Sequence, residues 1–106
     1  MAETISEITF TYEEDGEVLS EELDRIVLQK GVWAVILFRY RDRNRKTGEF
    51  GPAKACIRRY QKFKGTYKKR DSVNLSREST ETLVATLSGW MDEGLLGDDG
   101  SSQGSE

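Results

Sequence analysis

Alternating apolar and polar positions predict short strands at the start of the chain. Residues 8–12 read Ile-Thr-Phe-Thr-Tyr, and a period of two is typical of a half-buried strand. Asp15-Gly16 is a two-residue turn signal that we expect to fold residues 17–19 back as a short hairpin. The period then changes, because Ser20 is followed by acids and the apolar side chains fall at i, i+3 and i+4. This spacing predicts a short helix near residues 20–30.

The middle of the chain predicts three further strands. Residues 32–43 are rich in β-branched and aromatic side chains, which favour a long strand. Residues 44–52 hold two glycines and the one proline of the chain, and they predict a loop. Two more strand-like segments, residues 53–63 and 67–75, are separated by a Lys64-Gly65 turn.

An amphipathic helix is predicted after Ser76, a residue type that caps helix N-termini well. Gly94 is placed to end this helix. The apolar side chains of this helix recur at i, i+1, i+4, i+7 and i+8 and form one stripe: Leu83, Val84, Leu87, Trp90 and Met91. The stripe is wide enough to seal a sheet, so we expect an α+β fold in which three to four strands are backed by this helix.

The length of 106 residues fits one domain, which we assign to residues 1–96. Residues 97–106 are Gly, Ser, Asp, Gln and Glu, and we expect a disordered acidic tail there. The longest apolar run, residues 32–38, has seven residues and is too short to span a membrane. The lone Cys56 suits a reducing compartment. We therefore expect a cytoplasmic protein.

Every basic residue lies in the middle of the chain. Residues 1–24 carry nine acids and no base, residues 25–77 carry all sixteen bases with three acids, and residues 78–106 carry seven acids and no base. Aromatic side chains are interleaved with the bases. This mixture suits nucleic acid, because cations bind phosphates and flat rings stack on bases. A solvated basic face, neutralised by the acidic ends of the chain, is the alternative.

Strand alternation assigns these charges to one side of the expected sheet, with the C-terminal helix on the other side. We expect Tyr60 to be the exposed aromatic side chain of this basic platform. Residues 32–37 are apolar on both faces, which indicates either intrachain packing on both sides or the seam of a homodimer. The residues that we expect to bind nucleic acid are Arg39, Arg41, Arg43, Lys54, Arg58, Tyr60, Lys62, Lys68 and Arg70.

Residue types that carry catalysis or metal binding are scarce. The chain has no histidine, so it has no imidazole base and no histidine metal ligand. A single cysteine cannot build a thiolate zinc site. No glycine-rich phosphate loop precedes a helix. We expect no enzyme activity, no metal and no cofactor.

Residues 53–92 carry a series of short motifs. The stretch Ile57-Arg58-Arg59-Tyr60 is followed by a glycine turn and a basic run, and then by Val73-Asn74-Leu75, which leads into the last helix. This pattern resembles the transcriptional coactivator family named for positive cofactor four, with a matching core of about residues 32–92. The resemblance implies a curved antiparallel sheet backed by a helix, a homodimer, and binding of single-stranded DNA. It further implies nucleic-acid contacts at Arg58, Tyr60, Lys68 and Arg70, and helix packing by Leu83, Leu87 and Trp90.

We therefore expect non-catalytic binding of single-stranded nucleic acid, in transcription or DNA maintenance. Only the resemblance favours DNA over RNA. The alternative is a protein–protein adaptor whose basic sheet docks an acidic partner. In a third interpretation, compatible with the first, the acidic ends of the chain mimic nucleic acid and cover the basic platform. Exposed aromatic side chains distinguish a nucleic-acid binder from an adaptor for acidic proteins. A base that stacks on such a ring contributes roughly 1–3 kcal/mol, whereas an acidic partner needs charge alone.

Overall fold

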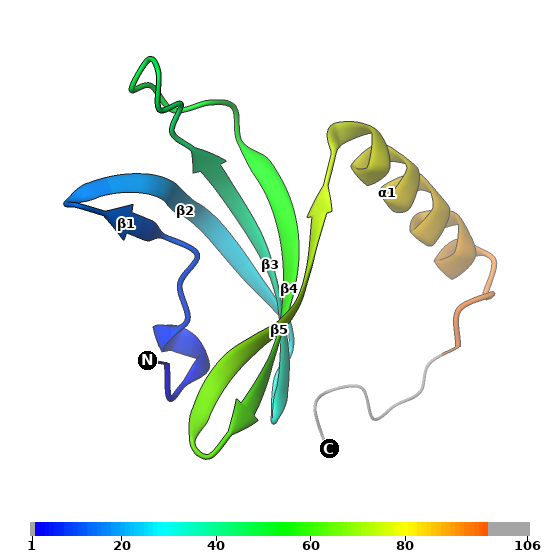
Figure 1. The fold of residues 1–106 in the computed structure, drawn as a ribbon. Coiled ribbons are helices and arrows are strands. Elements are labelled where there is room, and N and C mark those ends of the chain that lie inside the picture. Colours follow the sequence, from blue (N-terminus) through cyan, green and yellow to red (C-terminus); the bar gives the residue numbers. More distant parts are fainter. Residues whose placement is uncertain (1, 98–106) are drawn as a thin grey trace.

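A five-stranded, curled antiparallel sheet forms the body of the protein (Figure 1). The computed structural model describes residues 2–97. The α+β class is confirmed, with five strands in place of the expected three to four, and the expected acidic tail lies outside the described residues except for Gly97. The elements follow the order η1 (Ile5–Glu7), β1 (Tyr12–Glu14), β2 (Glu17–Gln29), β3 (Trp33–Asp42), β4 (Lys54–Phe63), β5 (Thr66–Leu75) and α1 (Arg77–Asp92), and each strand pairs with its neighbour in the chain.

Two tight turns fix the register of the hairpins. Asp15-Gly16 joins β1 to β2 and Lys64-Gly65 joins β4 to β5, and both pairs have φ values of 54° and 82°. Two consecutive positive φ angles produce the turn whose twist matches that of paired strands. Both predicted turns are confirmed. The expected strand at residues 8–12 is wrong, since β1 begins only at Tyr12.

The helix expected near residues 20–30 is also wrong, because this segment is the long strand β2. Its register with β3 shifts twice, and Leu23 and Leu28 are the two extra residues. Each bulge moves the alternation of side chains by one position. The apolar side chains of β2 therefore have a spacing that imitates a helix, although the backbone is extended.

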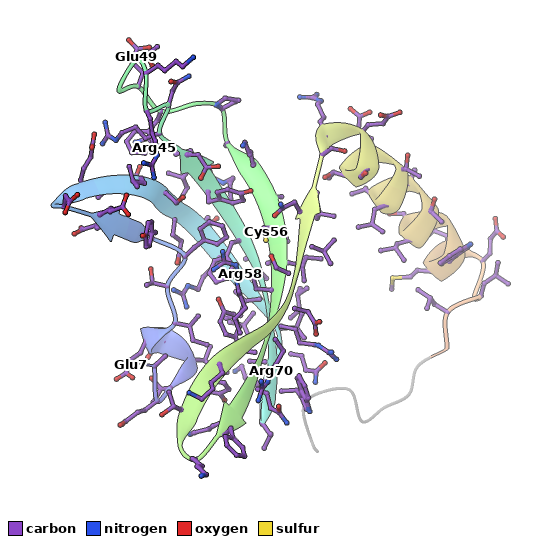
Figure 2. The ribbon with its side chains drawn as sticks, viewed as in Figure 1. Glu7, Arg45, Glu49, Cys56, Arg58 and Arg70 are labelled. Atoms are coloured by element: carbon purple, nitrogen blue, oxygen red, sulfur yellow. The ribbon has the colours of Figure 1, made fainter. Side chains whose placement is uncertain are left out.

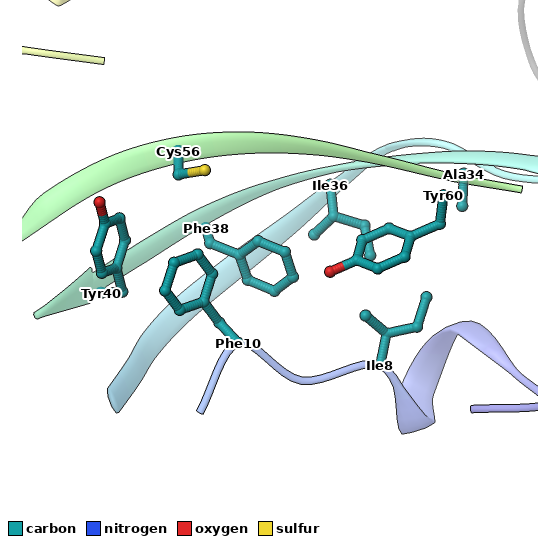
Figure 3. Close-up of a cluster of buried hydrophobic side chains, with 8 residues drawn as sticks. All are labelled: Ile8, Phe10, Ala34, Ile36, Phe38, Tyr40, Cys56 and Tyr60. Carbon is teal, nitrogen blue, oxygen red and sulfur yellow. The ribbon is translucent and has the colours of Figure 1, made fainter. Parts of the chain in front are cut away.

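The core lies on one face of the sheet, which we call the core face. Residues 2–11, here called the N-terminal segment, cross this face without belonging to a strand, and Ile8 and Phe10 point from the segment into the sheet (Figure 3). The segment thus replaces the helix that we expected to cover the sheet. The buried side chains are Ala34, Ile36, Phe38 and Tyr40 of β3, Cys56 and Tyr60 of β4, and Ile8 and Phe10 of the segment.

Two side chains of β2 hold the N-terminal segment in place. The Glu22 carboxylate accepts hydrogen bonds from the backbone N–H of Phe10 at 2.9 Å and from Arg25 Nε at 2.8 Å. Arg25 also donates to the carbonyls of Ile5 and Ile8. Partial burial by itself would raise the pKa of Glu22, but the hydrogen bonds from Arg25 and Phe10 hold that pKa below its ordinary value.

Helix α1 lies on the opposite side of the sheet from the N-terminal segment (Figure 1). The helix begins where Ser76 Oγ accepts from the N–H of Ser79 at 3.0 Å, and Gly94, with φ 72°, follows its end. None of its residues is buried, and the apolar stripe is exposed, from 38% at Leu87 to 69% at Met91. The expectation that this stripe seals the sheet of its own chain is therefore wrong. Within residues 2–97, no helix has the length and apolar composition that a membrane crossing requires.

The variant Glu22→Gln tests how the N-terminal segment is held. At about pH 7 we expect it to lower the free energy of unfolding by about 1–3 kcal/mol, because Gln loses the charge-assisted bonds to Arg25. The folded pKa of Glu22 is lowered, so its stabilisation is present above the ordinary value of 4.5 and is lost as the pH falls through the folded value. In chemical denaturation the difference between parent and variant should shrink towards zero in acid. A difference that does not shrink as the pH is lowered would contradict this role.

Candidate nucleic-acid interface

The residues expected on one basic platform lie on both faces of the sheet. Tyr40 pairs directly with Lys54, whereas Arg39 pairs with Ala55. Directly opposed residues of an antiparallel pair share a face. The single platform is therefore wrong, because alternation within each strand does not fix the phase of one strand against the next. The core face carries Lys54, Arg58 and Lys62, and the opposite face, here called the open face, carries Arg39 and Arg41.

Three of the expected site residues are engaged by acids at the end of the sheet next to loop 43–53. The acids come from β2 and from the end of β3. The centroid of the Phe50 ring also lies 4.1 Å from the guanidinium carbon of Arg41 and 4.4 Å from that of Arg43. Cations that already face carboxylates are poor sites for phosphate. The ion pairs are Arg41–Glu21 at 2.6 Å, Arg43–Glu17 at 3.5 Å and Lys54–Asp42 at 3.3 Å.

Arg58 and Tyr60 lie beneath the N-terminal segment. Tyr60 is only 6% exposed and belongs to the buried cluster with Ile8 (Figure 3), so its expected place on an exposed face is wrong. The guanidinium of Arg58 (Figure 2) lies 3.9 Å from the centroid of the Phe10 ring. Its Nε is buried and has no hydrogen-bond partner among residues 2–97. The core face therefore holds a cation and aromatic rings that are covered in this structure.

The opposite end of the sheet carries cations that no acid among residues 2–97 engages. We call residues 62–70 the cationic hairpin, which joins the end of β4 to the start of β5. Three of its bases belong to the expected site and two were missed, although nine residues with five bases and no acid are a visible signal in the sequence. Within the described part of the chain none of them forms an ion pair: Lys62, Lys64, Lys68, Lys69 and Arg70.

A bulge distributes these cations around the hairpin. Arg70 is the extra residue of the bulge, and its Nε donates to Gln61 Oε1 at 3.0 Å. The register places Lys62 and Lys69 on the core-face side and Lys68 on the open-face side. The positive charge therefore surrounds the end of the sheet instead of forming a flat platform.

Aromatic side chains accompany these cations. Phe63 is 49% exposed, with Lys64 Nζ 5.4 Å from its ring centroid. The Tyr67 hydroxyl donates to the carbonyl of Gly31 at 2.7 Å and so fixes the β2–β3 turn against the hairpin. This contact brings Lys30, a further exposed base, to the same end of the sheet. The cationic hairpin thus combines free positive charge with a ring that a base can reach.

Other chemistry is sparse in this part of the molecule. Among residues 2–97, no three acidic or cysteine side chains gather into a group that could hold a metal ion. Cys56 is buried, with its Sγ 3.2 Å from Ser72 Oγ. Comparison of the chain with protein-family models, curated proteins and solved structures finds no match.

Two aromatic variants test the face assignment. Tyr60→Ala should lower the free energy of unfolding by roughly 3–5 kcal/mol, because it empties a buried position. Phe63→Ala removes an aromatic side chain from the exposed hairpin end and should change stability by no more than about 0.5 kcal/mol. Chemical denaturation of both variants measures the difference. Similar losses for the two would mean that the burial described above is wrong.

Proposed function

We propose that this protein binds single-stranded nucleic acid, without catalysis, through the cationic hairpin (residues 62–70). The observation that carries the proposal is the contrast between the two ends of the sheet. At the loop end Arg41, Arg43 and Lys54 face carboxylates, whereas the five bases of the hairpin face none within the described residues. Free cations release their counterions when phosphates bind, and this release is the main source of sequence-independent affinity.

The shape of the surface favours a single strand over a duplex. The cations surround a narrow hairpin end, and a flexible strand can follow them where a stiff duplex would reach only one side. The exposed ring of Phe63 offers a stacking platform that only an unpaired base can use. For the ligand we propose DNA, because the resemblance of residues 32–92 to the positive-cofactor-four family is the one feature that separates DNA from RNA. We place this activity in the cytoplasm, as the lone cysteine predicts.

Paired charge variants test the binding surface. The double variant Lys64→Gln/Lys69→Gln should flatten the plot of log affinity for oligothymidine against log salt by about 1.4, since each phosphate contact on a single strand contributes about 0.7. The matched control, Arg45→Gln/Lys46→Gln, removes the same charge from loop 43–53 and should change the slope much less. Fluorescence titrations at several salt concentrations give both slopes. Equal changes in the two double variants would contradict a localised site.

The same titrations separate nucleic-acid binding from the adaptor alternative. Phe63→Ala should weaken binding of oligothymidine by roughly 1–3 kcal/mol, the contribution of one stacked base. Its affinity for polyglutamate, an acidic chain without bases, should not change. If the variant binds both polymers as the parent does, the hairpin is a charge-only docking surface.

We also propose that a second copy of the chain covers the open face, giving a homodimer. The apolar stripe of α1 is exposed, as are Ile26 and Val73 on the open face. An open hollow of about 800 Å³ separates the start of α1 from the sheet, with Leu37 and Leu75 in its lining. Apolar side chains that are exposed side by side are typical of interaction sites. Because one chain carries both surfaces, two copies related by a two-fold axis can bury them against each other.

A charge placed in the stripe of α1 tests the dimer. Leu87→Glu should convert the parent dimer into a monomer, because the new carboxylate would be buried without a partner. Ala85→Glu, on the opposite side of the same helix, should remain dimeric. Sedimentation velocity distinguishes the two states. A monomeric parent, or a dimeric Leu87→Glu variant, would contradict the proposal.

A further inference from the structure

We propose that the N-terminal segment (residues 2–11) occupies part of the nucleic-acid path, and that single-stranded nucleic acid displaces it from the core face. In the closed state Phe10 takes the place of a stacked base. The inference rests on the proposed function and adds a regulation of the same surface. A strand bound at the cationic hairpin would extend onto the core face only after the segment leaves.

The contacts of Phe10 are those that a nucleobase makes with protein. Its ring is stacked on Tyr40, with centroids 4.1 Å apart and an interplanar angle of 25° (Figure 3). The Arg58 guanidinium lies 3.9 Å from the centroid of the same ring. Stacking on an aromatic ring and contact with an arginine are the common ways in which single-stranded bases are held.

Arg58 is incompletely satisfied in the closed state. Its buried Nε has no acceptor among residues 2–97, because the ring of Phe10 supplies a face but no hydrogen-bond acceptor. A buried donor without a partner is costly. A nucleobase offers both a flat face and acceptor atoms on its edge. Exchange of Phe10 for a base would therefore give Arg58 the partner that it lacks.

The segment begins at the cationic hairpin. The backbone N–H of Tyr67 donates to the carbonyl of Ala2 at 2.8 Å, at the end of the sheet where Lys62 and Lys69 lie on the core-face side. Residues 2–11 carry two acids and no base. A strand held by the hairpin cations is therefore placed to continue along the path that this acidic segment now covers.

Few backbone bonds oppose the displacement. The segment pairs with no strand, and its central part is held by the side chains of Glu22 and Arg25 and by the burial of Ile8 and Phe10. It can therefore leave without breaking a strand ladder. If only the open state binds, the apparent affinity is the affinity of the open state multiplied by the fraction of molecules that are open.

Hydrogen exchange on the full chain tests the displacement directly. Saturating oligothymidine should remove the protection of the Phe10 amide, which is bonded to Glu22 in the closed state. The amide of Arg43, which directly follows β3 and donates to the carbonyl of Leu19 in β2, should remain protected. Binding with full protection of Phe10 would overturn the displacement while leaving the proposed function intact. Absence of binding would overturn both.

A matched pair of variants tests the effect on affinity. Ile8→Ala weakens the segment and should tighten the apparent dissociation constant for oligothymidine by roughly tenfold, since a larger fraction of molecules is open. Ile57→Ala makes the same change on the open face and should leave the constant unchanged. Circular dichroism at the titration temperature checks that both variants are folded. Equal affinities, or weaker binding by Ile8→Ala, would overturn the proposal.

Discussion

The structure depends on one requirement, that the apolar face of a single sheet be covered. A lone antiparallel sheet is stable only when a second layer packs on it. Here the second layer is the N-terminal segment, which has no regular strand of its own. Ile8 and Phe10 fill the core face, and Glu22 and Arg25 fix the backbone that carries them. The burial of Tyr60 follows from this cover.

The same cover divides the positive charge of the chain. Acids in β2 and at the end of β3 engage the bases at the loop end of the sheet, and the N-terminal segment covers Arg58. Among the described residues, neither these acids nor the N-terminal segment forms an ion pair with the cationic hairpin. A chain with a net charge of −3 therefore presents one concentrated positive end. Among residues 2–97, acids therefore engage the bases at the loop end of the sheet and form no ion pair with those of the cationic hairpin.

The two proposed partners use different sides of the sheet. Nucleic acid would occupy the cationic hairpin and then the core face, where the N-terminal segment now lies. A second copy would occupy the open face, next to α1, which lies on the opposite side (Figure 1). Dimer formation and displacement of the segment are therefore compatible. In such a dimer each copy would keep its own hairpin free for a strand.

The sequence by itself determined the local elements. Alternation and turn residues predicted β3, β4 and β5 closely, and the cap at Ser76 predicted the start of α1, because these signals act over a few neighbouring residues. Only the tertiary structure decided which residues share a face. The bulges at Leu23 and Leu28 gave β2 an apolar spacing that resembles a helix. The pairing of β3 with β4 placed the residues of the expected basic platform on both faces of the sheet. Strand phase and the choice of cover depend on contacts between segments distant in the chain, and alternation within one strand is the same for either phase.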